Sequence, residues 1–198
     1  MPLTSLPNLL TLSRIAAVPI VIALFYVPGN EARWLACVLF TAAAVTDWLD
    51  GHMARRWQQQ SDIGRFLDPI ADKLLVAATL LMLTASGRLP TGALLPALVI
   101  LCREILVSGL REYLAGLRVG LPVSRLAKWK TTIQMVAIGV LIVGNAGPAF
   151  VPVKAIGGTL LWLAAILTLI TGYDYLRAGL PHLSRTPAPR HGEPQRLG

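Results

Sequence analysis

Six long apolar stretches follow one another along this chain of 198 residues, and short breaks rich in glycine and proline separate them. Each stretch is close to the roughly 20 residues that an α-helix needs to cross the hydrocarbon core of a membrane. The stretches cover residues 9–27, 31–56, 68–85, 93–114, 125–143 and 155–176. The chain is therefore predicted to be an all-α integral membrane protein with six transmembrane helices.

The composition supports this class. Hydrophobic residues make up 55% of the chain and charged residues only 14%, whereas soluble domains carry about 25% charged residues. The first stretch lacks the basic region and cleavage site of a signal peptide, so it is expected to remain as a membrane span. Cys37 and Cys102 lie inside apolar stretches and are expected to be buried thiols without a disulfide.

Basic residues indicate the orientation. Six spans place both termini on one side of the membrane, and we assign 15 of the 18 Lys and Arg residues to that side, leaving Arg33, Arg88 and Lys154 on the other. By the positive-inside rule, both termini are cytoplasmic. The net charge is +8, and the basic residues lie beside apolar helices. This placement favours anionic lipid and phosphate partners over nucleic acid.

Two regions are expected along the chain. Residues 1–180 form one transmembrane domain. Residues 181–198 are rich in Pro, Arg and Gly and contain too few apolar residues to build a core. They are predicted to be a disordered cytoplasmic tail.

Four aspartates lie close to the ends of the second and third apolar stretches: Asp47, Asp50, Asp68 and Asp72. A charged group inside a span costs about 2.5 to 3.5 kcal/mol, so four together indicate a functional site. The first two are three residues apart and the last two are four apart, so each pair lies on one face of its helix.

Carboxylates that face one another repel unless a cation lies between them. An oxygen-only ligand set favours Mg²⁺ or Mn²⁺, and two such ions about 4 Å apart are typical of phosphoryl transfer. The sequence therefore predicts a site for two divalent ions. The alternative is ion pairing of the aspartates with Arg55, Arg65 and Lys73.

Small residues surround these aspartates. Gly51 and Ala54 leave room for a phosphate beside the first pair, and Gly64 permits a turn before the second pair. Asp68 followed by Pro69 has the pattern of a helix N-cap with proline at the first helical position. The third helix is therefore predicted to begin at Asp68, with the positive end of its dipole facing the metal site.

The combined pattern is D-x2-D-G-x2-A-R-x8-G-x3-D-x3-D, between residues 47 and 72. It resembles the signature of the CDP-alcohol phosphatidyltransferases, which are integral membrane enzymes. The segments LPNLLTLSRI, TDWLDGHMARR, FLDPIADKLLVAA, REILVSGLREYLA and KWKTTIQM are similar to the bacterial branch that transfers a phosphatidyl group to glycerol 3-phosphate.

This resemblance implies a role for each matching residue. The metal ligands would be Asp47, Asp50, Asp68 and Asp72, and Asp72 would also accept the proton of the alcohol. The CDP-lipid pocket would contain Gly51, Ala54, Arg55, Ser61 and Gly64. The reaction would join CDP-diacylglycerol to glycerol 3-phosphate and release CMP. The resemblance also implies a homodimer in the bacterial inner membrane, with its active site facing the cytoplasm.

Basic residues in the fourth and fifth stretches indicate which kind of alcohol accepts the phosphatidyl group. The residues expected to bind its phosphate are Arg103, Arg111 and Lys128. A phosphorylated alcohol needs such cations more than serine or inositol does. Two simpler roles stay open for these side chains: Arg103 pairs with Glu104 or the aspartates, and Arg111, Lys128 and Lys130 extend to lipid headgroups.

Two alternatives to this function also stay open. Another acceptor, such as inositol phosphate, serine or phosphatidylglycerol, would keep the same chemistry. A divalent-cation transporter would belong to a different class, since carboxylates inside a membrane also mark ion paths. A transporter is expected to place polar groups through the membrane midplane, whereas these aspartates cluster near one interface.

Overall fold

The computed structural model describes residues 6–57, 62–116 and 124–183, and the side chains of residues 10–46, 67, 70–116 and 124–181. Within these ranges the chain consists of helices joined by short turns and contains no strand, so the predicted all-α class is confirmed. The elements are α1 (Leu6–Tyr26), α2 (Asn30–Trp57), α3 (Asp62–Ala85), α4 (Leu94–Gly116), α5 (Arg125–Val143), the short 3-10 helix η1 (Gly144–Ala146) and α6 (Val153–Leu183).

The third helix begins earlier than its sequence predicts. Helix α3 starts at Asp62, so Asp68 and Pro69 lie inside the helix and do not form its N-terminal cap. The turn expected at Gly64 is likewise helical backbone. Apolar residues at positions 63, 66, 67 and 70 have helical spacing and continue the periodic pattern upstream of the proline. The positive end of the α3 dipole therefore lies six residues before Asp68.

The fifth and sixth helices differ in how well the sequence predicts their ends. Helix α5 covers the predicted residues, and Ser124 caps it by accepting a hydrogen bond from the backbone N–H of Ala127 at 3.2 Å. Helix α6 continues to Leu183, so the first three residues of the expected tail are helical. The rest of that tail, 184–198, lies outside the described residues.

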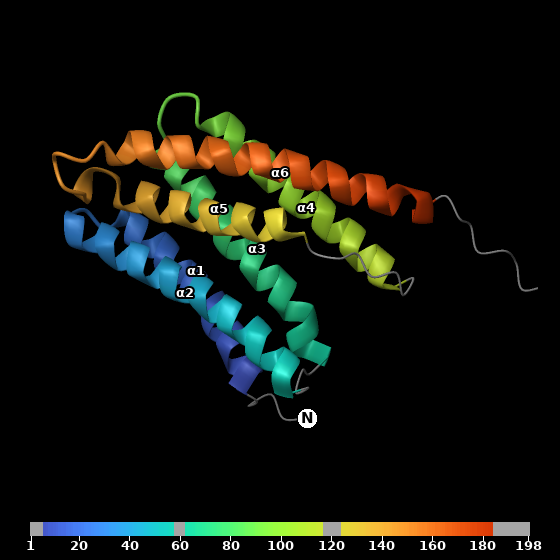
Figure 1. Ribbon diagram of the computed structural model, residues 1–198. Helices are drawn as coiled ribbons and strands as arrows, with labels where there is room; N and C mark the ends of the chain where they lie inside the picture. Colours follow the sequence, from blue (N-terminus) through green and yellow to red (C-terminus); the bar gives the residue numbers. More distant parts are fainter. Residues whose placement is uncertain (1–5, 58–61, 117–123, 184–198) are drawn as a thin grey trace, which may run out of the picture.

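The helices alternate in direction along the chain (Figure 1). Helix α1 packs against α2 and α3, α5 packs against α2 and α6, and α6 packs against α4. The starts of α3 and α5 therefore lie toward the same end of the bundle as the ends of α2 and α4 (Figure 1). Residues far apart in the sequence meet at this end.

Close helix packing forms the core. Ile138, Leu141 and Leu161 are fully buried between α5 and α6. Gly157 of α6 faces Leu141, and a Cβ atom at this glycine would lie 2.7 Å from Leu141 Cγ. Small residues at such contacts let helix backbones approach closely, as is typical of helices packed within a membrane.

Large apolar side chains also cover the outer faces of the helices. Leu81 is 62% exposed, Ile105 69% and Leu169 56%. By length and composition, the described stretches Arg125–Ala146 and Val153–Pro181 can cross a membrane. Both cysteines are free thiols, as predicted. The predicted burial is wrong for Cys102, which is exposed on the outer face of α4, and Cys37 is only half-buried.

Arg88 joins the α3–α4 connection to the end of α1. Its guanidinium is buried, donates a hydrogen bond to the Phe25 carbonyl at 3.4 Å and lies 4.4 Å from the centre of the Phe25 ring. Burial lowers the pKa of Arg88, and the charge of Arg33 lowers it further. Because an arginine stays charged at neutral pH, Arg88 stabilises the negative C-terminal end of α1.

Candidate active site

A polar cavity of about 400 Å³ lies among α3, α4, α5 and α6. This volume is within the range of small-molecule sites. Four basic and three acidic side chains contribute to its lining: Lys73, Arg103, Arg111, Lys130, Asp72, Glu104 and Glu112. So many charges between apolar helices indicate a binding site for a charged molecule.

Asp72 lines this cavity from α3, where its side chain is half-buried. It is the one member of the aspartate motif whose side chain lies within the described residues. The carboxylate predicted to accept a proton therefore faces the same space as the cationic side chains. This arrangement brings a carboxylate and several cationic groups to the wall of one cavity.

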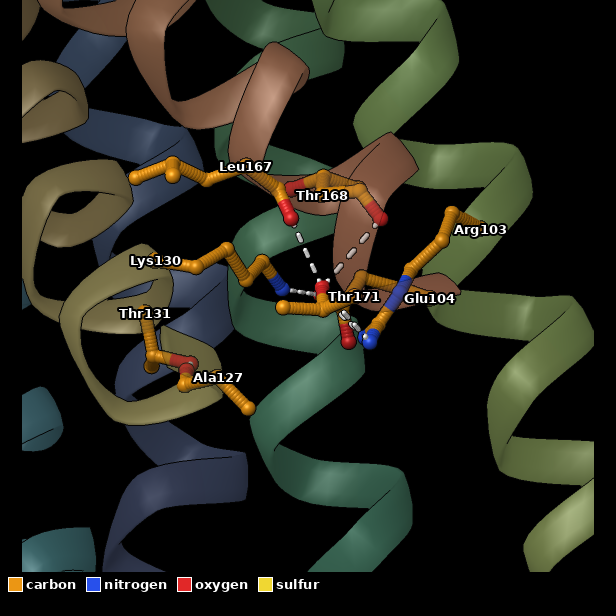
Figure 2. Close-up of polar contacts among 8 residues, drawn as sticks. All are labelled: Arg103, Glu104, Ala127, Lys130, Thr131, Leu167, Thr168 and Thr171. Carbon is orange, nitrogen blue, oxygen red and sulfur yellow. Dashed lines mark hydrogen bonds and ion pairs between the residues drawn. The ribbon is translucent and has the colours of Figure 1, made fainter. Parts of the chain in front are cut away.

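Lys130 extends into the cavity from α5. Its side chain is only 3% exposed, and its Nζ donates a hydrogen bond to Glu104 Oε1 of α4 (Figure 2). A buried ammonium group needs such a partner because burial without one is costly. This ion pair joins α5 to α4 at the cavity wall.

Arg103 approaches the same carboxylate from α4. Its Nη1 lies 3.7 Å from Glu104 Oε1, and its Nη2 donates a hydrogen bond to Thr171 Oγ1 of α6 at 3.2 Å (Figure 2). Thr171 in turn donates to the Leu167 carbonyl at 2.8 Å. The pairing of Arg103 with Glu104, which the sequence allowed, is therefore present.

Helix α6 also shapes the position of Arg103. The guanidinium carbon lies 5.6 Å from the centre of the Tyr175 ring, within reach of a cation–π interaction. Gly172 leaves room for the arginine, since a Cβ atom there would lie 3.1 Å from Arg103 Cγ. Arg103 thus has contacts from α4 and α6 that restrict its orientation.

The spacing along α5 decides which lysine faces the cavity. Ala127, Lys130 and Thr131 line it from positions i, i+3 and i+4, which share one helix face. Lys128 is exposed and is not among the lining residues. Arg103 and Arg111 line the cavity from α4. The structure therefore adds Lys130 to the predicted cationic set, and the role of Lys128 stays a prediction.

Most of the predicted metal and CDP-lipid site lies outside the side chains that the structure describes: Asp47, Asp50, Asp68, Gly51, Ala54, Arg55, Ser61 and Gly64. Among the described side chains, no three His, Cys, Asp or Glu residues are placed so that they could hold a metal ion. The backbone is helical at positions 47, 50, 68 and 72, so each aspartate pair keeps the one-face spacing. An oxygen-only donor set of this kind fits a hard divalent ion.

A model of the CDP-alcohol phosphatidyltransferase family matches residues 4–170. The chain belongs to this family. The match includes the aspartate motif, α3, α4, α5 and the first part of α6. The family assignment made from the sequence is therefore confirmed. Members of this family generally use divalent metal ions.

Relatives cover nearly the whole chain. A protein of Rickettsia typhi is 47% identical over 174 residues, which is 88% of this chain and 96% of the relative. One of Pseudomonas fluorescens is 45% identical over 183 residues, which is 90% of this chain and 92% of the relative. One of Shigella flexneri is 41% identical over 176 residues, which is 88% of this chain and 94% of the relative. All three are named CDP-diacylglycerol–glycerol-3-phosphate 3-phosphatidyltransferase.

Proposed function

We propose that this chain transfers the phosphatidyl group of CDP-diacylglycerol to glycerol 3-phosphate and releases CMP. The family and the names of the relatives support the reaction. One structural observation carries the choice of acceptor: cationic side chains share a cavity with Asp72. An acceptor that bears both a hydroxyl and a phosphate can use both kinds of group at once.

The acceptor phosphate is proposed to bind among Lys130, Arg103 and Arg111. Hydrogen bonds from charged donors to phosphate oxygens are stronger than neutral ones. Glu104 neutralises part of this charge and links Lys130 to Arg103. The two cations are thereby held in place before the phosphate arrives, which lowers the cost of ordering them on binding. Lys128 is proposed to assist from its exposed position on α5.

Asp72 is proposed to take the proton from the primary hydroxyl of the acceptor. The hydroxyl oxygen then forms a bond to the phosphorus that carries diacylglycerol, and the bond from this phosphorus to the CMP oxygen breaks. CMP leaves with the electron pair of that bond. Binding both substrates side by side converts this attack into an effectively intramolecular step.

Asp47, Asp50, Asp68 and Asp72 are proposed to hold two divalent ions, Mg²⁺ or Mn²⁺. Bound ions of this kind neutralise pyrophosphate charge and stabilise the leaving phosphate. Gly51, Ala54, Arg55, Ser61 and Gly64 are proposed to line the CDP pocket, where glycines permit close approach of a phosphate to the backbone.

The setting is proposed to be the bacterial inner membrane, with six spans, both termini and the cavity on the cytoplasmic side. The alternating helix directions and the charge asymmetry support this orientation. The acyl chains of the donor would remain among the membrane lipids. The chain is further proposed to act as a homodimer, as the family resemblance implies.

The deciding experiment measures CMP release by the full chain, purified in detergent, with CDP-diacylglycerol and Mg²⁺ or Mn²⁺. Glycerol 3-phosphate, serine, inositol, inositol phosphate and phosphatidylglycerol are supplied separately. We expect release that depends on glycerol 3-phosphate. CMP release only with one of the other acceptors would overturn the acceptor assignment. If folded protein released no CMP with any acceptor, the result would favour a transporter.

A further inference from the structure

Gln134 is a buried polar residue that the proposed reaction does not yet use. It lies one helical turn beyond Lys130 on α5 and is 2% exposed. Its Oε1 atom is buried and accepts no hydrogen bond from the part of the chain that the structure describes. A buried oxygen without a hydrogen-bond donor costs about 1–3 kcal/mol of stability. A donor group on a bound molecule would remove this cost.

A small hollow adjoins Gln134. Its volume is about 30 Å³, and its lining consists of Asp72, Lys73, Val76, Glu104, Thr131, Gln134 and Met135. Four of these residues also line the 400 Å³ cavity: Asp72, Lys73, Glu104 and Thr131. The hollow is therefore a side recess of the active-site cavity, large enough for one hydroxyl group or water molecule.

The lining selects for a neutral hydrogen-bond donor. Gln134 Oε1 and the carboxylates of Asp72 and Glu104 are acceptors, which disfavours an anion. Lys73 also lines the recess, which disfavours a metal cation. Thr131 already donates its hydroxyl proton to the Ala127 carbonyl at 3.1 Å, so it offers only lone pairs. A hydroxyl group meets all these conditions.

We infer that this recess binds the secondary hydroxyl of glycerol 3-phosphate, which donates a hydrogen bond to Gln134 Oε1. The inference rests on the proposed function. Asp72 lines both spaces, so a primary hydroxyl at Asp72 has its neighbouring carbon beside the recess. Lys130 and Gln134 are four residues apart, about 6 Å along the helix axis, which leaves the phosphate end of the acceptor near Lys130.

Gln134 is then a specificity-determining residue. Sites built to hydrogen-bond a substrate hydroxyl reject analogues that lack it by up to about 10⁴–10⁵, because the polar groups of the site stay unpaired. Three contacts, at the two hydroxyls and the phosphate, also fix the configuration of the central carbon. The enantiomer of the acceptor cannot make all three.

The test compares two acceptors in the CMP-release assay: sn-glycerol 3-phosphate and 1,3-propanediol monophosphate, which lacks only the secondary hydroxyl. The unmodified chain is expected to prefer glycerol 3-phosphate by at least about 10² in kcat/KM. Q134M removes the acceptor oxygen at similar length and is expected to reduce this preference to below about tenfold. Activity toward propanediol phosphate reports on folding within the same sample.

T168V is the matched control. Thr168 Oγ1 is another fully buried oxygen that has no hydrogen-bond partner among the described residues, but Thr168 lies outside the recess. T168V is expected to keep the preference of the unmodified chain. Q134E retains an oxygen that can accept a hydrogen bond, so it is also expected to keep the preference for glycerol 3-phosphate. If Q134M is inactive with both substrates, the preference of Q134E is the result that tests the inference.

If the unmodified chain used both acceptors equally well, the recess would hold water and not a substrate hydroxyl. That result would overturn this inference and leave the proposed function intact. An unchanged preference in Q134M, or a lost preference in Q134E, would also overturn it. CMP release only with an acceptor other than these two would overturn the proposed function together with the inference.

Discussion

Asp72 faces the cationic cavity and belongs to the aspartate motif. In the proposed reaction it accepts the hydroxyl proton, so D72N removes the base while it keeps the size of the side chain. We expect turnover to fall by at least the ~10² typical of a lost general base. Binding of CDP-diacylglycerol, measured by calorimetry in detergent, should change little. An equal loss of binding and turnover would contradict the role as base.

Lys130 and Lys128 offer a matched pair, because they lie two residues apart on α5 and only Lys130 lines the cavity. K130M removes a charge-assisted contact worth about 1.5–3 kcal/mol. We expect the KM for glycerol 3-phosphate to rise about 10- to 100-fold, with little change in the KM for CDP-diacylglycerol. K128M removes the same charge from an exposed position, so its effect should be smaller. A larger effect of K128M would place the phosphate closer to Lys128 than to Lys130.

The sequence predicts several of these residues but cannot rank the lysines. Arg103 and Arg111 are expected near the acceptor, and both line the cavity. Lys128 and Lys130 differ by about 200° around a helix, so only one of them can face a given neighbour. The direction of that neighbour depends on how α4 and α5 each pack against α6. The spacing of charges along one helix does not contain this information. The same holds for Gln134, because the lack of a hydrogen-bond partner for its Oε1 among the described residues depends on the tertiary structure.

Gly172 of α6 lies against Arg103, which is proposed to bind the acceptor phosphate. A Cβ atom there would lie 3.1 Å from Arg103 Cγ, and the branched side chain of valine would displace the arginine from Thr171. We therefore expect G172V to raise the KM for glycerol 3-phosphate at least tenfold, by steady-state kinetics.

The control for this variant is G109V, because a Cβ atom at Gly109 of α4 meets nothing within 4 Å. G109V should leave the KM for glycerol 3-phosphate close to its original value. Similar effects of the two substitutions would indicate a general loss of helix packing and contradict a specific role for Gly172.

Element boundaries are predictable where apolar runs end at turn residues. The start of α5 follows from the polar cap at Ser124, whose side chain satisfies a free backbone N–H. The start of α3 does not follow, because Pro69 favours a helix start locally while the apolar residues before it continue the helical pattern. Helix α6 likewise continues past Pro181 and ends at Leu183. In both helices the periodic pattern outweighs the local signal.

At the scale of the whole molecule, the aspartate site depends on ions that offset its charge. Carboxylates brought together without a cation repel one another. We expect excess EDTA to abolish CMP release by the purified chain, and addition of Mg²⁺ or Mn²⁺ beyond the chelator to restore it. The extent of recovery with each ion identifies the preferred metal. Unchanged rates in excess chelator would contradict the metal-dependent mechanism.

The orientation of the molecule can be tested by cysteine labelling. Phe150 is 88% exposed in the α5–α6 connection, on the side that carries few basic residues. Arg125 is exposed at the start of α5 and lies two residues before Ala127, which lines the cavity. In a C37A/C102A background, a membrane-impermeant maleimide added to intact spheroplasts should label F150C and leave R125C unlabelled. Disruption of the membrane should expose R125C as well, which serves as the control for reactivity.

This pattern is expected because the membrane potential and anionic lipid both favour retention of Lys and Arg on the cytoplasmic side. The cavity then opens toward the compartment that supplies a water-soluble phosphorylated alcohol. The reverse pattern would place the cavity outside and contradict the charge assignment. Labelling of both positions in intact spheroplasts would show that α5 does not cross the membrane, although its length and composition allow it to.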